Sequence, residues 1–403
     1  MAQVGIRLWR MAFLSWLLVL VGVVVCQAMA CGGASPEVRR LLLPSPLPSG
    51  VKENDMVPVL LYVPDHAPEE RLPAVVILHS WGGKRLTTEK ALARRLIRHG
   101  IAAAIPDLPY QHGRRPQGVR HPQDRMISGD LQQTRIAFAQ AIADVRNLIA
   151  YLRNQPEIDA TRIGLAGVSL GAIISVLVMA EEKDICCGVL MLGSADLPLL
   201  LQRSPILLRV RRQLRNRGIR YEDVPSRVAP IEPAQAARQL RDTPILMVNA
   251  LHDWVVPRRC VAELREALGN PPILWLNSSH YSAQVRRGPI LDRVALFLDT
   301  YLHQPDTPLP QQREQFDSGL VPKIALVHIA GIGTRWAILF EVTRWTGSET
   351  VEGEAGVSPA GILCGIKATL VRYNGVGVAD MSAGVRLWVN EPIREYLGIS
   401  IHF

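Results

Sequence analysis

The chain has 403 residues, of which 48% are hydrophobic and 20% are charged. This ordinary globular balance excludes a collagen, a coiled coil or a disordered chain as a description of the whole, and the length suggests two domains or one large domain with an appendage. The formal net charge of +9 comes mainly from arginine. It permits contact with an anionic surface, but it is too modest for us to expect a nucleic-acid partner.

The first 30 residues are predicted to be a signal peptide or membrane anchor. Arg7 and Arg10 precede an uncharged apolar stretch at 11–26, and Ala28-Met29-Ala30 is a small-x-small cleavage pattern. The stretch is short for a membrane span. We expect an exported protein (periplasmic, cell-surface or secreted), either cleaved, with or without lipid on Cys31, or held by an uncleaved anchor. A buried helix of a cytosolic fold is the remaining alternative.

The six cysteines do not have the spacing of a metal site, so no metal is expected. Cys186 and Cys187 are adjacent and open an apolar strand, where buried free thiols are the usual outcome. Export would also permit disulfides, which the sequence does not assign.

Residues 31–54 are rich in Gly, Pro and Ser and are predicted to be a linker. From 55 to 303, short apolar strands alternate with amphipathic helices. The expected strands are 74–78, 101–105, 163–166, 188–192, 244–250 and 272–276, and the expected helices include 88–99, 131–153, 172–180 and 290–302. This alternation predicts an α/β fold with a doubly wound, mainly parallel sheet.

Residues 195–240 interrupt the alternation. Seven arginines lie between Arg203 and Arg220, with interleaved apolar residues at Ile206, Leu207, Val210 and Leu214. The pattern predicts a basic amphipathic helix. It indicates a solvated cap over the edge of the sheet or, alternatively, a surface that contacts a membrane or an anionic substrate.

Residues 304–319 contain three prolines and are predicted to be a second linker. The segment 320–403 is predicted to be a small β-rich domain, since its apolar runs are short and separated by Gly-containing turns. The runs are 323–330, 335–341, 366–373 and 385–389. This domain carries no catalytic motif that we recognise, and its role is open.

The main chemical signal is the sequence Gly167-Val168-Ser169-Leu170-Gly171, between a predicted strand and a predicted helix. So sharp a strand-to-helix turn strains the serine backbone and lifts its hydroxyl out at the carboxyl edge of the sheet. The glycines are needed because side chains there would collide with neighbouring backbone. Ser169 is therefore the candidate nucleophile.

A serine hydroxyl needs a base, and the base needs an orienting acid. Asp253 directly follows the strand 244–250 and is the candidate acid. Asp242 precedes that strand and Asp292 lies in a helix, so neither occupies the expected place. His280 lies in the loop after the final strand of the alternation and is the candidate base. His252 adjoins the acid but precedes it, and we expect a supporting role for it.

The reaction also needs donors for the developing oxyanion. The backbone N–H of Leu170 directly follows the nucleophile and is one candidate. The loop His79-Ser80-Trp81-Gly82-Gly83 follows the strand 74–78, and its glycines permit a close approach to the substrate. The backbone N–H of Trp81 is the second candidate.

Together these segments resemble the α/β-hydrolase superfamily, in particular the dienelactone-hydrolase-like and prolyl-oligopeptidase-like serine esterases. The resemblance covers about residues 55–303 and rests on His79–Gly83, Pro106-Asp107, His112-Gly113, Gly167–Gly171, Asp253 with Val256-Pro257, and His280. It implies a Ser-Asp-His triad, no cofactor, and a small-molecule ester or related acyl substrate. Dienelactone hydrolases proper have a cysteine as the nucleophile, whereas this chain has Ser169, which favours an esterase.

The sequence thus predicts an exported or membrane-tethered serine hydrolase of carboxylic esters. One alternative is a peptidase of prolyl-oligopeptidase type, although those usually carry a propeller and no repeat of that kind is visible here. Another is a surface binding protein on an inactive hydrolase scaffold.

Overall fold

The computed structural model describes residues 37–83, 85–119, 121–281, 283, 287–310 and 313–317, and the backbone of strands between residues 321 and 402. The predicted signal peptide or anchor lies outside these residues. Within the described ranges, no helix is both long and apolar enough to span a bilayer.

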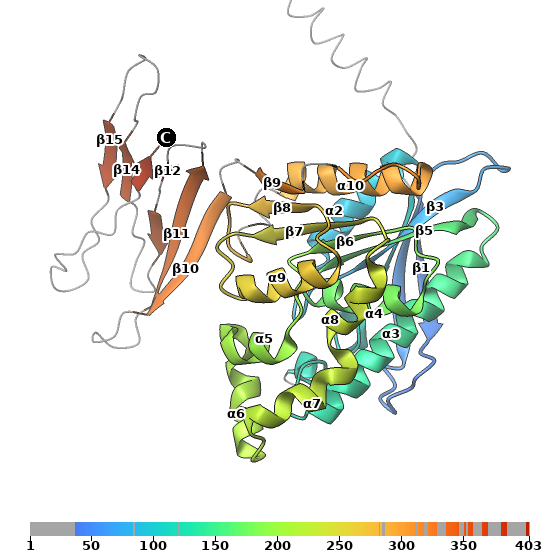
Figure 1. The fold of residues 1–403 in the computed structure, drawn as a ribbon, viewed down its shortest axis with the longest axis horizontal. Helices are drawn as coiled ribbons and strands as arrows, with labels where there is room; N and C mark the ends of the chain where they lie inside the picture. Colours follow the sequence, from blue (N-terminus) through green and yellow to red (C-terminus); the bar gives the residue numbers. More distant parts are fainter. Residues whose placement is uncertain are drawn as a thin grey trace, which may run out of the picture. The chain divides into compact units, whose positions relative to one another are not determined.

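Nine strands form one sheet in the order β1-β2-β4-β3-β5-β6-β7-β8-β9 (Figure 1). From β4 to β9 all neighbouring strands are parallel, and β2 pairs antiparallel with β4. The strands are β1 (Glu37–Pro44), β2 (Met56–Val63), β3 (Leu72–Leu78), β4 (Ala102–Pro106), β5 (Ile158–Val168), β6 (Cys187–Met191), β7 (Ile245–Ala250), β8 (Ile273–Leu276) and β9 (Glu314–Asp317). The predicted α/β class and mainly parallel sheet are confirmed.

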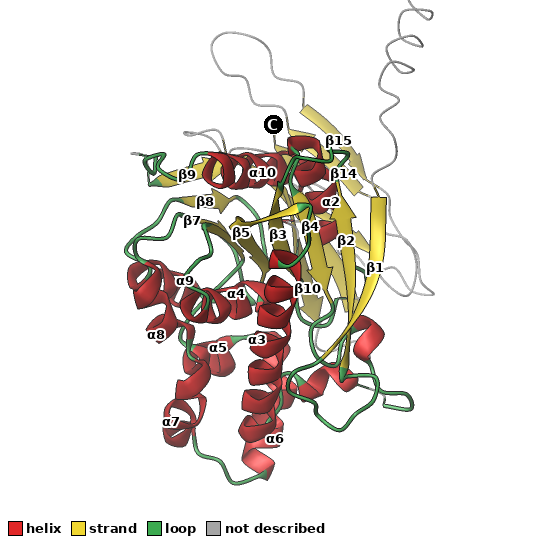
Figure 2. Ribbon diagram, turned by 90° about the vertical axis from the view of Figure 1, so that its right-hand side faces the viewer, coloured by secondary structure: helices red, strands yellow, loops and turns green. Residues whose placement is uncertain are grey.

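Both faces of the sheet are buried, as its near-continuous apolar strands require. Along β3, Val75 and Ile77 belong to one hydrophobic core, whereas Ala74, Val76 and Leu78 belong to the other. Helices α2 (Thr87–Leu96) and α10 (Arg287–His303) cover the first face, and α3 (Leu131–Arg153), α4 (Leu170–Glu181) and α9 (Arg258–Ala267) cover the second (Figure 2). This two-sided burial holds the carboxyl ends of the strands in fixed positions.

After β1 and β2, the chain forms β3 and then places β4 on one side of β3 and β5 on the other. The order of the strands therefore reverses around β3. In open parallel sheets, ligands bind at the carboxyl ends of strands beside such a reversal. The loops after β3 and β5 are the two that meet there.

Both segments predicted to be linkers contain an edge strand, and the linker prediction is wrong for these residues. β1 lies within 31–54, and β9 lies within 304–319 and pairs parallel with β8. Without β9, the backbone groups of β8 would face solvent as an open edge. The Arg265 guanidinium donates to Glu314 and ties β9 to α9.

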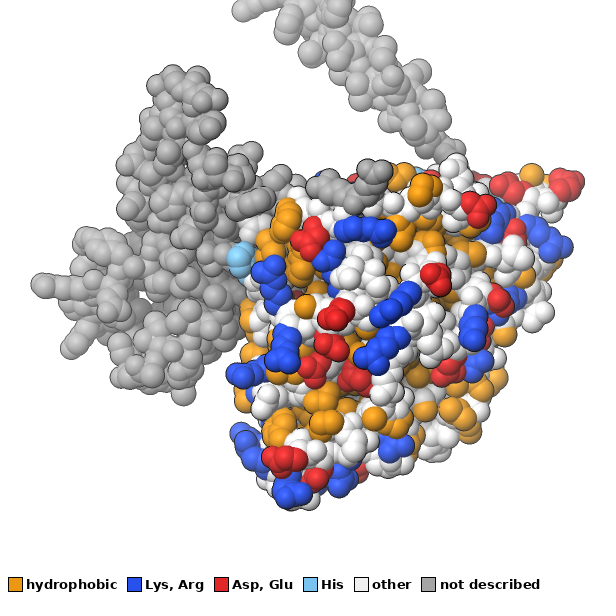
Figure 3. Space-filling view, in the orientation of Figure 1, with side chains coloured by type: hydrophobic (Ala, Val, Ile, Leu, Met, Phe, Trp, Pro, Cys, Tyr) orange, Lys and Arg blue, Asp and Glu red, His pale blue; other side chains and the backbone are white. Residues whose placement is uncertain are grey.

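The insertion at 195–240 folds as helices α5 (Leu197–Arg203), α6 (Leu208–Asn216), α7 (Val224–Val228) and α8 (Pro233–Ala237). Val210 and Leu214, on the apolar face of α6, are buried in the core. On the outside, Arg209 pairs with Asp124 and Arg217 with Asp130. Figure 3 shows basic and acidic side chains interspersed on this side of the molecule, rather than one basic field. The observations favour the cap over the membrane-contact alternative.

The predicted β-rich segment 320–403 contains two further sheets. In one, β11 (Trp336–Trp345) pairs with β10 (Val321–His328), β12 (Thr350–Val351) and β13 (Glu354–Val357). In the other, β14 (Gly365–Thr369) lies between β15 (Asp380–Gly384) and β16 (Ser400–His402). The predicted strand 385–389 lies outside the described residues.

Candidate active site

Ser169 occupies a strained turn between β5 and α4. Its backbone has φ 53° and ψ −112°, a combination that a residue with a side chain rarely adopts. The Ser169 N–H donates to Met191 O on the neighbouring strand at 2.8 Å, which holds the turn in place. The strain expected from the sequence is therefore present at the candidate nucleophile.

The glycines on either side of Ser169 are required by backbone contacts. A Cβ on Gly171 would overlap the carbonyl oxygen of Leu78 at the end of β3, and one on Gly167 would overlap the carbonyl of Gly171. Side chains at these positions would push α4 away from the two strands. The close approach also fixes the start of α4 against the loop that follows β3.

Asp253 and His280 form a hydrogen-bonded pair. The Nδ1 atom of His280 lies 2.7 Å from Asp253 Oδ2, and Oδ1 accepts the N–H groups of Val255 and Val256 at 2.8 Å each. The side chains of His280 and Asp253 are only 8% and 3% exposed. Both oxygens of the carboxylate are thus engaged, so it can orient the imidazole with Nδ1 protonated and Nε2 left for other chemistry.

Ser169, Asp253 and His280 follow β5, β7 and β8, at the same carboxyl edge of one sheet. Among the described residues, no hydrogen bond joins the Ser169 hydroxyl to His280. In unliganded hydrolases this bond is often long and tightens when substrate binds. His252, predicted to have a supporting role, places Nε2 3.0 Å from Asn277 Oδ1.

His79 anchors the loop after β3. Its Nε2 accepts the N–H of Leu108 at 2.9 Å, and its Nδ1 lies 2.9 Å from Ser80 O. Burial and the neighbouring His112 lower the pKa of His79 to about 3. The ring is therefore neutral at physiological pH and serves as a hydrogen-bonded support.

Two glutamines complete the support of this loop. The Gly82 N–H donates to Gln111 Oε1 at 2.6 Å, and the indole N–H of Trp81 donates to Gln123 O at 3.0 Å. Within the described residues, the backbone N–H groups of Trp81 and Leu170 have no hydrogen-bond acceptor. Both N–H groups are thus available to donate, and their role as oxyanion donors stays a prediction.

A buried network beneath the loop 107–115 was not predicted from the sequence. Arg114 is fully buried and pairs with Asp144 at 2.7 Å. It also donates to the carbonyl oxygens of Asn54 and Asp107. The network fixes the loop that carries Gln111, and Gln111 connects it to Gly82, the residue after the candidate oxyanion donor Trp81.

Asp107 is a titratable group of this loop with an unusual environment. Burial raises its pKa to about 6, although the Gly113 N–H donates to Oδ2 at 2.9 Å and Arg114 lies near. Gly113 leaves little room, since a Cβ there would lie 3.0 Å from Asp107 Oδ2. The Asp107 and His112-Gly113 motif is therefore a packed turn that positions Gln111.

Cys186, Cys187 and Cys260 are free thiols, and burial raises the pKa of Cys187. Cys187 is buried as predicted, whereas Cys186 is half-buried. In the described part of the chain, no group of three or more His, Cys, Asp or Glu side chains could hold a metal ion.

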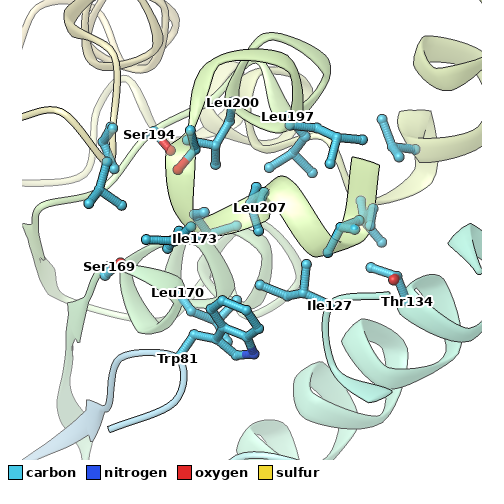
Figure 4. A pocket seen from close by; sticks show the side chains of 18 of the residues that line it. Trp81, Ile127, Thr134, Ser169, Leu170, Ile173, Ser194, Leu197, Leu200 and Leu207 are labelled. Carbon is cyan, nitrogen blue, oxygen red and sulfur yellow. The ribbon is translucent and has the colours of Figure 1, made fainter. Parts of the chain in front are cut away.

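A pocket opens beside Ser169 (Figure 4). The free space in and around it, including open solvent at its mouth, is about 800 Å³. Its walls come from the loop after β3, from α3 and α4, and from the cap. The lining includes Trp81, Ile127, Leu131, Phe138, Ser169, Leu170, Ile173, Leu197, Leu200, Leu201, Leu207, Val210 and Ile231. No sequence pattern indicates this pocket, because its residues come from segments far apart in the chain.

Solved structures with the same fold include 2,6-dihydroxy-pseudo-oxynicotine hydrolase and the acylaminoacyl peptidase of Pyrococcus horikoshii. The first is 19% identical with a TM-score of 0.50, and the match covers 69% of this chain and 72% of the chain of that structure. The second is 15% identical with a TM-score of 0.52, and the match covers 70% of this chain and 43% of the chain of that structure. These similarities establish the α/β-hydrolase fold.

Curated relatives match at the level of sequence. An uncharacterized protein of Mycobacterium tuberculosis (strain H37Rv) is 32% identical over an alignment of 227 positions, which covers 53% of this chain and 50% of that protein. The chain thus spans about half the length of this relative. Esterase YjfP of Escherichia coli K12 is 25% identical over 53% of this chain and 81% of its own length.

The model of the dienelactone hydrolase family matches residues 57–273, which include the Ser169 turn, the loop 79–83 and Asp253. This match spans more than half of the chain, and its relatives and structural neighbours include both esterases and peptidases. The chain belongs to the dienelactone hydrolase family and has the α/β-hydrolase fold.

Proposed function

We propose that this protein is a serine hydrolase that cleaves carboxylic esters through an acyl-enzyme. Ser169 is the nucleophile, His280 the general base and acid, and Asp253 the residue that orients His280. The observation that carries the proposal is the hydrogen bond from His280 to Asp253 at the sheet edge where the strained Ser169 turn lies. The similarity to an esterase adds support.

In the first half of the reaction, Ser169 Oγ attacks the acyl carbon while His280 Nε2 takes the hydroxyl proton. Asp253 stabilises the imidazolium that forms. The carbonyl oxygen becomes an oxyanion and accepts the N–H groups of Leu170 and Trp81. The tetrahedral intermediate then collapses, the bond to the alcohol oxygen breaks, and His280 returns the proton to that oxygen.

In the second half, water replaces the alcohol. His280 takes a proton from the water as it attacks the acyl carbon of the ester on Ser169. Collapse of the second tetrahedral intermediate breaks the bond to Ser169 Oγ, which recovers its proton from His280. The products are the free carboxylic acid and the regenerated enzyme. Besides the ester and one water molecule, the proposed steps use the side chains of Ser169, His280 and Asp253 and the two backbone N–H groups.

The test is hydrolysis of p-nitrophenyl butyrate by the wild-type protein, by Ser169→Ala and by Ser226→Ala. Loss of a triad nucleophile lowers turnover by on the order of 10⁶-fold. We expect Ser169→Ala to lose the activity with an unchanged circular dichroism spectrum, and the exposed Ser226→Ala control to keep it. Parallel assays with an N-acetyl-amino-acid p-nitroanilide distinguish an esterase from a peptidase. A wild-type protein that cleaves neither substrate contradicts the proposal.

We also propose that the N-terminal segment directs export. The support is Arg7 and Arg10 before the apolar stretch 11–26 and the pattern Ala28-Met29-Ala30. Mass spectrometry of the N-terminal peptide tests this. A free Cys31 terminus indicates a cleaved signal, a lipidated and membrane-bound Cys31 indicates a lipoprotein, and a retained Met1 or Ala2 in the membrane indicates an anchor. A full-length chain found only in the soluble cytoplasm contradicts export.

A further inference from the structure

We infer that the pocket beside Ser169 binds the acyl group of the substrate, and that this acyl group is an apolar chain carrying an oxygen substituent. The identification of the bound group as the acyl part of the substrate rests on the proposed ester hydrolysis. The existence and chemistry of the binding site rest on the pocket itself. Its three components are the apolar lining, the direction of the pocket from Ser169, and two buried serine hydroxyls.

The lining of the pocket is mostly aliphatic and aromatic, and its polar residues all carry hydroxyl groups: Ser128, Thr134, Ser169, Ser194 and Ser204. Figure 4 shows Leu170, Ile173 and Leu207 around its centre, with Leu197 and Leu200 from α5 above them. No Lys, Arg, Asp or Glu is among the described residues that line it. An ionic or strongly hydrated group would lose its water there without gaining a partner. The pocket therefore favours a hydrocarbon chain.

The roof of the pocket is the cap, and the cap is anchored. Val210 of α6 lines the pocket from the inside. Arg209 of the same helix and Arg217, which directly follows it, reach outward to Asp124 and Asp130. The Gly129 N–H donates to Gln213 Oε1 at 2.8 Å, which ties α6 to the segment before α3. These contacts keep the pocket open without a ligand, as a preformed binding site requires.

The pocket extends on the acyl side of the nucleophile. His280 must protonate the alcohol oxygen as it leaves, so the alcohol has to lie toward His280. Ser169 and the two oxyanion donors, Trp81 and Leu170, all border the pocket, whereas His280 is not among the residues that line it. The part of the substrate that enters the pocket is therefore the one that stays attached to Ser169.

Two hydroxyl groups in this apolar lining have no hydrogen-bond partner. Ser194 and Ser204 are both 0% exposed, and the Oγ atoms of both are unpaired among the described groups. Ser194 lies beside Leu200 at one end of the pocket (Figure 4). A buried hydroxyl without a partner is unfavourable, and a polar atom of the ligand relieves this. A hydroxyl or carbonyl oxygen on the acyl chain is the group that fits.

Binding is measured apart from turnover, by titrating Ser169→Ala with free carboxylic acids in a calorimeter. The probes are acetate, butanoate, hexanoate, octanoate and decanoate. Each methylene that enters an apolar pocket contributes about 0.8 kcal/mol, or about fourfold in affinity. We expect the affinity to rise by about fourfold per methylene from butanoate to octanoate. An affinity that does not change with chain length overturns the inference.

Leu200→Trp in the Ser169→Ala background tests whether this gain arises in the pocket. Leu200 is half-buried and lines the pocket, so the larger indole of tryptophan occupies space that the ligand needs. Leu197→Trp is a second variant with the same purpose. The control is Leu208→Trp, which adds the same indole at a residue 62% exposed on the adjoining helix of the cap. We expect the first two variants to abolish the dependence on chain length and the control to keep it. Equal effects at positions 200 and 208 contradict the assignment.

The oxygen substituent is tested with octanoate and its monohydroxylated derivatives, from the 3-hydroxy to the 8-hydroxy acid. At least one derivative should bind about 3- to 10-fold more tightly than octanoate, the gain expected from one additional hydrogen bond. Ser194→Ala or Ser204→Ala should remove this preference, whereas the exposed Ser226→Ala should not. If every hydroxylated acid binds more weakly than octanoate, the hydroxyls are satisfied by water and this part of the inference is wrong.

These outcomes separate the two proposals. Chain-length-dependent binding in a protein that hydrolyses no ester leaves the pocket intact and refutes the ester hydrolase. Hydrolysis of butyrate by a protein whose affinity for acids does not depend on chain length supports the hydrolase and refutes the acyl pocket.

Discussion

The Nδ1 atom of His280 lies 2.7 Å from Asp253 Oδ2, while the other oxygen of the same carboxylate accepts two backbone N–H groups. The backbone bonds hold Asp253 at the end of β7, and Asp253 in turn holds the imidazole at the end of β8. A carboxylate that accepts at both oxygens leaves His280 with a defined tautomer. The proposed chemistry depends on that tautomer, because it makes Nε2 the proton acceptor.

Asp253→Asn is expected to lower kcat for ester hydrolysis by about 10⁴-fold while the fold is kept. The amide can orient the ring, but it stabilises the wrong tautomer and does not stabilise the imidazolium. The measurement is kcat for p-nitrophenyl butyrate, with Asp242→Asn as the control at an exposed aspartate before β7. If the two variants keep similar activity, Asp253 is not the orienting acid.

Gly171→Ala is expected to lower the free energy of unfolding by about 1–3 kcal/mol, the range for overpacked positions. The new methyl group overlaps backbone atoms of Leu78, which cannot rotate away as a side chain would. Activity should also fall, because α4 and the loop 79–83 move apart. Denaturation in urea measures the first effect and ester hydrolysis the second.

The control for this substitution is Gly288→Ala in α10, where the nearest atom to the added Cβ is Arg95 Nη2 at 3.6 Å. That distance is an ordinary van der Waals contact, so we expect no loss of stability. A Gly171→Ala protein as stable and active as the Gly288→Ala protein would show that the close packing at the Ser169 turn is not required.

Asp107→Asn is expected to become more stable relative to wild type as the pH rises from 4.5 to 7.5. Burial raises the pKa of Asp107 from its ordinary 3.8 to about 6. The stabilisation from the protonated carboxyl is fully present below pH 3.8 and is lost as the pH rises through about 6. Asparagine stays neutral and can still accept the Gly113 N–H. The relative gain is at most about 3 kcal/mol.

Urea denaturation of both proteins at pH 4.5 and pH 7.5 measures this gain. Asp159→Asn is the matched control. At Asp159, burial raises the pKa, but hydrogen bonds from Thr161 and Arg162 outweigh it and lower the pKa to about 2. Its stabilisation is therefore constant between pH 4.5 and 7.5. A relative stability of Asp107→Asn that falls with pH would have the wrong sign for a buried carboxylate.

A chain that ends after Asp317 is expected to keep hydrolase activity and a higher melting temperature than one that ends after Asp306. The shorter chain lacks β9, so the edge of β8 is open and Arg265 loses Glu314. Thermal unfolding followed by circular dichroism compares the two. Equal melting temperatures would mean that β9 contributes nothing to the sheet, and an inactive chain ending at 317 would mean that the segment beyond it is needed for catalysis.

The strands and long helices were predictable because each carries its own local pattern. Apolar runs such as 74–78 form buried strands, and the periodic apolar residues of 131–153 form one face of α3. The Ser169 turn was predictable for the same reason, because the two glycines that its packing requires lie within five consecutive residues, 167–171. Asp253 and His280 could be selected by their places after successive strands, and they are in contact in the structure.

Other parts of the site have no local signal. Gln111 and Arg114 are single polar residues in an irregular loop, and only the folded chain shows that one holds Gly82 and the other is buried against Asp144. The pocket forms where α3, α4 and the cap meet, so no single segment predicts it. The short edge strands β1 and β9 lie in proline-containing segments whose composition is typical of linkers. Tertiary pairing, rather than local propensity, determines their structure.

The most direct test of the central claim is labelling with an alkyl fluorophosphonate, followed by mass spectrometry of the peptide that contains Gly167–Gly171. A serine activated by the His280–Asp253 pair forms a stable phosphonyl adduct, whereas an ordinary surface serine does not react. We predict a single adduct on Ser169, absent in Ser169→Ala and formed much more slowly in Asp253→Asn. An unlabelled protein, or an adduct on another serine, would contradict the assignment of Ser169 as the nucleophile.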